Sequence, residues 1–169
     1  DKITNRVSVL STGLNIDPIV VVQKAVPGLY SDISSVEIDT YLAETAAALT
    51  VEHPDYSYLA ARIKVNSLHK ETPGFIIATK NLYDDGLLRE DYYKKVMENA
   101  DAIESVIDYD KDYTFDYFAL TTLIRAYLLK FDNKTIERPQ DLWMRVTLTV
   151  TGNEFNFCLL YTSDAADDL

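Results

Sequence analysis

The chain has 169 residues, of which 47% are hydrophobic and 25% charged, a composition typical of a folded globular protein. Its net charge of −11 argues against nucleic-acid and membrane partners, because broad surfaces for both need clustered cations. Its apolar runs are also shorter than the ~20 residues of a membrane helix.

The chain contains few of the residues and motifs that form disulfides, metal sites or phosphate-binding loops. One cysteine cannot form an internal disulfide, and two histidines without a CxxC motif predict no zinc or other metal site. Neither GxGxxG nor GxxxxGK[ST] occurs, so the familiar glycine-rich phosphate loops are absent. No export signal opens the chain, and we therefore expect a cytoplasmic location.

The first 72 residues predict four helices. Residues 1–14 carry an apolar stripe with helical spacing, formed by Ile3, Val7, Leu10 and Leu14. Asp17 and Pro18 begin a second helix, which ends at Pro27–Gly28. A third helix is expected from Ser35, as its N-cap, to Thr50. After a break at His53–Pro54, residues 55–71 form the fourth.

Pro73–Gly74 marks a boundary in the sequence. Beyond it, residues 74–85, 90–108 and 115–130 are each predicted to form a helix. Asp132–Asn133 predicts the tight turn of a short β-hairpin. Pro139 is suited to the start of a last helix, although the VTLTV that follows favours a strand when taken alone. The sequence therefore predicts a mainly α fold.

Helix geometry brings three polar residues of the third and fourth helices together. Each helix is about 22 Å long at ~1.5 Å per residue, so an antiparallel hairpin returns Lys70 to the level of Ser35. Ser35 and Asp39 are four residues apart and share a helix face. A helix start and a lysine bind phosphate, whereas Asp39 suits a sugar hydroxyl or a base donor. The arrangement predicts a nucleotide pocket.

Each of these residues also has a simpler interpretation. Ser35 can be a helix cap only, Asp39 a solvated carboxylate and Lys70 a surface charge. His53 is expected to be a corner residue and His69 a structural one. A solvated face is expected for the acidic residues Asp101, Glu104, Asp108, Asp110 and Asp112.

Two long stretches resemble a known family. Residues 28–72, with the strings HPDY, AARI and LHKET, are similar to the ATP-cone of class I ribonucleotide reductase large subunits. Residues 108–146, with YLLK and ERPQ…MRV, resemble the segment that follows the cone at the start of the reductase body. The resemblance covers residues 1–156 in the order of the family, and is weaker over residues 75–108.

The resemblance implies an allosteric domain that senses ATP or dATP, with Mg²⁺ accompanying the nucleotide. Carried over by position, the effector contacts fall on Asp1, Lys2, Ser35, Asp39 and Lys70. Ser35 stands where the family usually has threonine, and the change keeps the hydroxyl. No catalytic residue is expected in this chain, because the reactive cysteines of the family lie further along.

The expected fold is a truncated ATP-cone four-helix bundle followed by further helices and a short β-hairpin. The domains are residues 1–72, a cone without its N-terminal strands, and residues 73–157, the start of the reductase N-terminal helical region. Residues 158–169 resemble a translated sequencing adaptor, so we interpret Cys158 as part of a non-native tail and not as a catalytic thiol.

The resemblance implies that the full-length protein is a ribonucleoside-diphosphate reductase, a thiyl-radical oxidoreductase that makes deoxyribonucleotides for DNA synthesis. Its partners would be a radical-generating small subunit and further copies of itself, and the fragment alone is predicted to be inactive. Two alternatives stay open: a cone-bearing transcriptional regulator, and a helical interaction module that binds no nucleotide.

Overall fold

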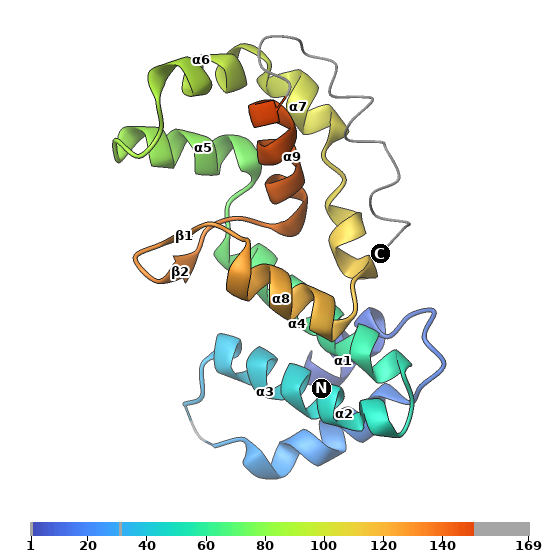
Figure 1. Cartoon of the computed structure of the whole chain (residues 1–169). Helices are drawn as coiled ribbons and strands as arrows, with labels where there is room; N and C mark the ends of the chain where they lie inside the picture. The colour runs from blue at the N-terminus through green and yellow to red at the C-terminus, as the bar shows by residue number, and fades with distance from the viewer. Residues whose placement is uncertain (1, 31, 151–169) are drawn as a thin grey trace. The chain divides into compact units, whose positions relative to one another are not determined.

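The computed structural model describes residues 2–30 and 32–150, which form two compact units. The first comprises the described residues up to Glu71 together with Asp110–Ala126, and the second Thr72–Tyr109 with the described residues from Tyr127 onwards. Helices make up nearly all the regular structure of these residues, beside one two-stranded hairpin (Figure 1). The predicted mainly α fold is therefore confirmed. The domain boundary between residues 72 and 73 stays a prediction.

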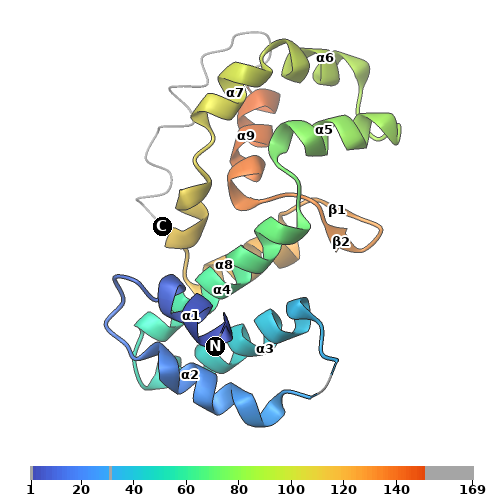
Figure 2. The ribbon, with the colours of Figure 1, turned by 180° about the vertical axis from the view of Figure 1, so that it is seen from behind.

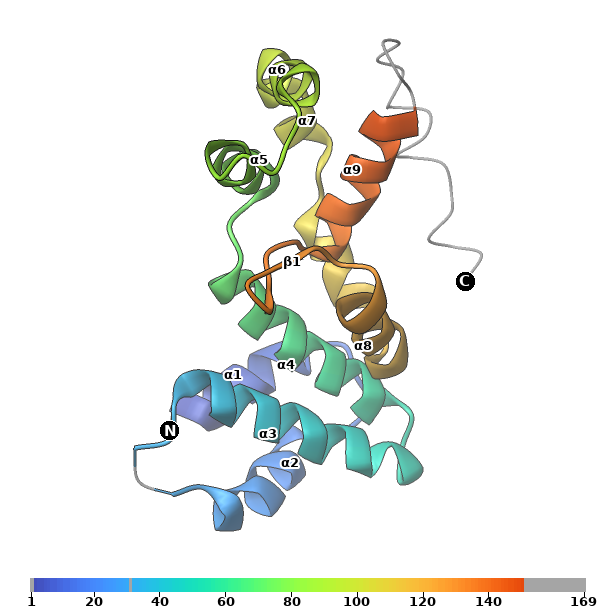
Figure 3. The ribbon, with the colours of Figure 1, turned by 60° about the vertical axis from the view of Figure 1, so that its left-hand side comes forward.

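The first unit is built around a bundle of four helices. Its elements are α1 (Lys2–Leu10), α2 (Pro18–Ala25), η1 (Val26–Gly28), α3 (Ser35–Ala48), η2 (Leu49–Val51), α4 (Asp55–Glu71) and α8 (Tyr117–Ala126). A further 3₁₀ helix, η3 (Tyr109–Thr114), crosses the division between the units. α3 and α4 lie side by side, and α1 and α2 pack against this pair (Figures 2 and 3).

The ends of the first helices are set by polar side chains. Asp17 caps α2 by accepting a hydrogen bond from the amide of Ile19 at 2.9 Å, with Pro18 in the first turn as predicted. α1 ends at Leu10, earlier than expected. Arg62 of α4 donates to the carbonyl oxygens of Leu10 and Thr12 at 3.0 and 2.8 Å. These bonds satisfy carbonyls that the end of α1 leaves unpaired, and they tie α1 to α4.

The core of the first unit is drawn from all four helices of the bundle. Its fully buried large side chains are Val7, Val21, Leu42, Leu59 and Ile63. The other members of the predicted stripe of α1 are half-buried against the same cluster: Ile3, Leu10 and Leu14. α8 packs on α4 through a smaller cluster formed by Ala61, Val65 and Leu120.

The second unit contains shorter helices around α9. Its elements are α5 (Phe75–Asp84), α6 (Glu90–Glu98), α7 (Ala100–Val106), β1 (Lys130–Phe131), β2 (Lys134–Thr135) and α9 (Pro139–Val150). Phe75, Val96, Ile103, Met144 and Leu148 form its buried cluster, in which α9 contacts α5, α6 and α7. The helix predicted at Pro139 is confirmed, because burial against three helices outweighs the strand preference of VTLTV.

The single helix predicted for residues 90–108 is wrong, because α6 and α7 are separate. Asn99 between them leaves the helical region, with φ −120° and ψ 17°. Its side-chain amide donates to the carbonyl oxygen of Lys95 at 2.9 Å. Asparagine offers the backbone such local bonds in place of helical ones, which explains the break.

The predicted hairpin is confirmed at Asp132–Asn133. Lys130 pairs with Thr135 and Phe131 with Lys134. Both turn residues have positive φ, 49° for Asp132 and 61° for Asn133. Two such residues are typical of a type I′ turn, for which Asn and Asp are favoured.

A buried polar network holds the start of α9 in the second unit. Tyr109 donates its hydroxyl to Asp141 at 2.7 Å and accepts from the amide of Phe75 at 3.1 Å. Arg138 stacks on the Tyr109 ring, 4.6 Å from its centroid, and donates to the carbonyl oxygen of Thr72 at 2.6 Å. Burial, and then the charge of Asp141, raise the pKa of Tyr109.

We predict that Tyr109→Phe lowers the free energy of unfolding by about 1–3 kcal/mol, because it removes a donor to the buried Asp141. Urea denaturation at neutral pH measures the change. Tyr127→Phe is the matched control, since Tyr127 is 60% exposed, and it should leave the midpoint unchanged. Equal midpoints for Tyr109→Phe and the wild type would contradict the role of the network.

Candidate functional site

The start of α3 carries a capping box. Ser34 is the N-cap: its hydroxyl accepts from the amide of Glu37 at 3.2 Å, and the Glu37 carboxylate accepts from the amide of Ser34 at 2.9 Å. The prediction of Ser35 as the N-cap is therefore wrong by one residue. The S-x-x-E spacing from Ser34 to Glu37 was the signal that it missed. The side-chain hydrogen bond with Ser34 lowers the pKa of Glu37.

The capping box leaves part of the helix start open to a ligand. It uses the amides of Ser34 and Glu37, so the amides of Ser35 and Val36 are the first-turn donors that it does not occupy. Ser35 and Val36 are both exposed. A helix start in this state attracts anions through its free amides and its dipole.

Asp39 lies one turn into α3 and is almost completely buried, with 1% of its surface exposed. Its Oδ2 accepts a hydrogen bond from Nζ of Lys70, in the last turn of α4, at 3.3 Å. The antiparallel hairpin thus brings Lys70 to Asp39, as the lengths of the two helices predicted. A carboxylate this deep in a protein needs cationic partners, because burial penalises the charged form.

The second cation at Asp39 is Arg6 of α1, which was not among the predicted site residues. Its guanidinium forms an ion pair with Oδ1 of Asp39. The contact lacks hydrogen-bond geometry, so Oδ1 has no hydrogen-bond partner among the described residues. Helical spacing places Arg6 on the same face of α1 as Lys2, but it does not indicate that this face meets Asp39.

The remaining predicted site residues lie around this centre. Ser35 is one turn before Asp39 on α3, and its side chain is exposed. Lys2 is exposed in the first turn of α1, one turn before Arg6, and makes no ion pair with a described residue. Asp1 lies outside the described residues. The structure therefore joins Asp39 to Lys70 directly and leaves Ser35 and Lys2 one turn away.

The three charged groups leave an excess of positive charge at the surface. Arg6 and Lys70 each carry one positive charge against the single negative charge of Asp39. Half of the Lys70 side chain is exposed, 51%, against 28% for Arg6. The site thus combines a half-exposed lysine, two helix-start amides that the capping box does not use, and a buried acceptor. Such a set can hold a molecule that carries both phosphate and hydroxyl groups.

A neighbouring pair fixes the end of α4. His69 Nε2 lies 2.7 Å from Oδ2 of Asp112, and the His69 ring meets Tyr113 edge-on at 5.5 Å between centroids. Asp112 is fully buried, so its assignment to a solvated acidic face is wrong, whereas the other four acidic residues are exposed. Sequence spacing does not predict the contact between His69 and Asp112, because the two residues are 43 positions apart. His69 has the structural contact that was expected of it.

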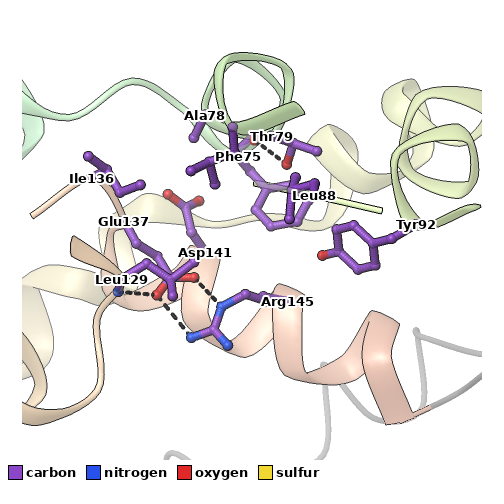
Figure 4. A pocket seen from close by; sticks show the side chains of 11 residues that line it. Phe75, Ala78, Thr79, Leu88, Tyr92, Leu129, Ile136, Glu137, Asp141 and Arg145 are labelled. Atoms are coloured by element: carbon purple, nitrogen blue, oxygen red, sulfur yellow. Dashed lines mark hydrogen bonds and ion pairs between the residues drawn. The ribbon is translucent and has the colours of Figure 1, made fainter. Parts of the chain in front are cut away.

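The second unit contains a small cavity between α5, α6, α9 and the hairpin (Figure 4). Its volume is about 30 Å³, and its walls include Phe75, Tyr92, Glu137 and Arg145. Arg145 donates a hydrogen bond to Glu137 at 2.6 Å. Burial raises the pKa of Tyr92 to about 12. Such a volume holds one or two water molecules and cannot hold a nucleotide.

Two further kinds of site are not found among residues 2–30 and 32–150. No three or more histidine, cysteine, aspartate or glutamate side chains lie close enough together to bind a metal ion. In the same residues, no helix has the length and apolar character needed to span a bilayer.

Comparison with known proteins matches two parts of the chain to protein families. Residues 1–71 match the family described as "ATP cone domain", and residues 113–168 match "Ribonucleotide reductase, all-alpha domain". The first match contains Arg6, Asp39 and Lys70. The second reaches residue 168, so it gives no support to a non-native origin of residues 158–169, which lie outside the described residues.

Curated relatives agree with these matches. The chain is 41% identical to the ribonucleoside-diphosphate reductase large subunit of Caenorhabditis elegans over 91% of its length. It is 42% identical to that of Danio rerio over 89%, and 40% identical to that of Variola virus over 89%. The chain spans about a fifth of the length of these relatives, which the alignments cover to 21%, 20% and 21%.

We predict that Ser34→Ala lowers the free energy of unfolding by about 1 kcal/mol, because the amide of Glu37 loses its acceptor. Ser35→Ala is the matched control and should be neutral in the absence of ligand, since Ser35 is exposed in the first helical turn. Thermal and urea unfolding measure both variants. A larger loss for Ser35→Ala than for Ser34→Ala would contradict the assignment of the cap.

Proposed function

We propose that this chain is the effector-sensing part of a ribonucleoside-diphosphate reductase large subunit, and that the Asp39 site binds ATP or dATP. The observation that carries the proposal is the buried Asp39 carboxylate held between Arg6 and Lys70, within the residues that match the ATP cone.

Different residues of the site suit different groups of the nucleotide. The amides of Ser35 and Val36 and the ammonium of Lys70 suit the phosphates, and Lys2 adds a second exposed cation on α1. Asp39 repels phosphate and suits a ribose hydroxyl or the adenine amino group. Mg²⁺ would arrive with the phosphates, as a partner of the nucleotide and not of a protein cluster.

In the complete protein, nucleotide binding at this site would regulate a reaction that takes place elsewhere in the protein. ATP would favour the active enzyme, and dATP would favour inhibited oligomers. The whole protein would reduce ribonucleoside diphosphates in the cytoplasm for DNA synthesis, with a small subunit that delivers the radical. The match of residues 113–168 favours this function over a cone-bearing transcriptional regulator, and the charged site favours it over a helical module without nucleotide.

We predict that calorimetry detects binding of both ATP and dATP to the 169-residue chain. Asp39→Asn should change the ratio of the two affinities by about tenfold or more, because a hydrogen bond to a charged group contributes about 1.5–3 kcal/mol. Asp84→Asn removes the same charge from an exposed position of the second unit and is the matched control. The proposal fails if the wild type gives flat traces with both nucleotides.

A further inference from the structure

We propose that Arg6 is a positioning residue that keeps the buried Asp39 carboxylate neutralised while Lys70 turns away to the effector phosphates. The inference rests on the proposed function of the site, and it explains how Lys70 becomes available to bind the phosphates. Lys70 is engaged by Asp39. A lysine that binds phosphate must therefore exchange one anionic partner for another.

The two cations at Asp39 are not equivalent. Arg6 contacts Oδ1, an atom that is sealed from solvent, and only 28% of its side chain is exposed. Lys70 contacts Oδ2 at 3.3 Å, and 51% of its side chain is exposed. Arg6 is thus the inner partner and Lys70 the outer one.

Side-chain chemistry favours the same division. Lysine is a compact charge on a flexible chain with three donors, so its ammonium can swing to a phosphate at little cost. Arginine has a planar group whose weaker hydration suits a buried ion pair. Arg6 also lies on α1, whose end is fixed to α4 by Arg62. The inner cation therefore stays in place when the outer one moves.

The charge on Asp39 makes the inner partner necessary. Breaking a buried ion pair by removing one partner is strongly destabilising, because it leaves an uncompensated charge. With Arg6 present, Lys70 can leave Asp39 and the carboxylate stays paired. Without Arg6, the carboxylate retains Lys70, and the phosphates must compete with Asp39 for its only remaining ion-pair partner among the described residues.

A double-mutant cycle tests this role with ATP as the probe in calorimetry. Arg6→Gln should weaken ATP binding by about tenfold, the effect of ~1.4 kcal/mol of coupling between neighbouring charges. Arg6→Lys should restore most of the affinity, since it returns the charge. In the Asp39→Asn background, Arg6→Gln should change the affinity by less than about twofold, because no buried charge remains to be neutralised.

The control is Lys24→Gln, which removes one cation from an ion pair with Glu52 at the end of α2 and should not alter ATP binding. Circular dichroism confirms that each variant is folded, and Arg6→Lys keeps the test informative if Arg6→Gln unfolds. An equal loss of affinity in both Asp39 backgrounds would overturn the inference, because Arg6 would then act by direct contact or by packing.

Failure of the inference differs from failure of the proposed function. Wild-type binding that Arg6→Gln leaves unchanged refutes the positioning role and leaves the nucleotide site intact. Absence of wild-type binding refutes the nucleotide site itself. In that case, urea denaturation without ligand tests the inner position of Arg6. Arg6→Gln should lower the urea midpoint more than Lys70→Gln does, and the reverse order would refute the inner position.

Discussion

The burial of one negative charge at Asp39 constrains three helices at once. The carboxylate belongs to α3, and its cations belong to α1 and α4. A charge with 1% exposure is tolerated only when its partners are close, so these helices must pack with their polar residues in register. The apolar cluster around Val7, Leu42 and Leu59 provides the packing, and the ion pairs select one arrangement of it.

This constraint also gives the site its chemical character. The capping box occupies two amides at the start of α3 and leaves two, while the side chain of Lys70 is half exposed. The pair formed by His69 and Asp112 holds the last turn of α4, from which Lys70 projects. Binding groups on fixed helices lose little entropy when a ligand arrives, which favours binding at this site.

Local rules predicted most of the helices and the centre of the site. Helix length and an antiparallel hairpin predicted Lys70 at the level of Ser35, and it bonds to Asp39 one turn further along α3. The Asp132–Asn133 pair predicted the hairpin turn. The misses have physical causes. Ser34 and Ser35 are chemically equivalent, and only the reciprocal bond with Glu37 selects one of them. The contact of Arg6 with Asp39 depends on how α1 packs in the bundle, and spacing within one helix does not predict that packing.

The most direct test of the account is a crystal structure of the chain with ATP. We expect the nucleotide at the start of α3, with the Lys70 ammonium on a phosphate oxygen and the Arg6 guanidinium still on Asp39. A nucleotide bound in the second unit, or bound at α3 while Lys70 remains paired with Asp39, would contradict the central claim.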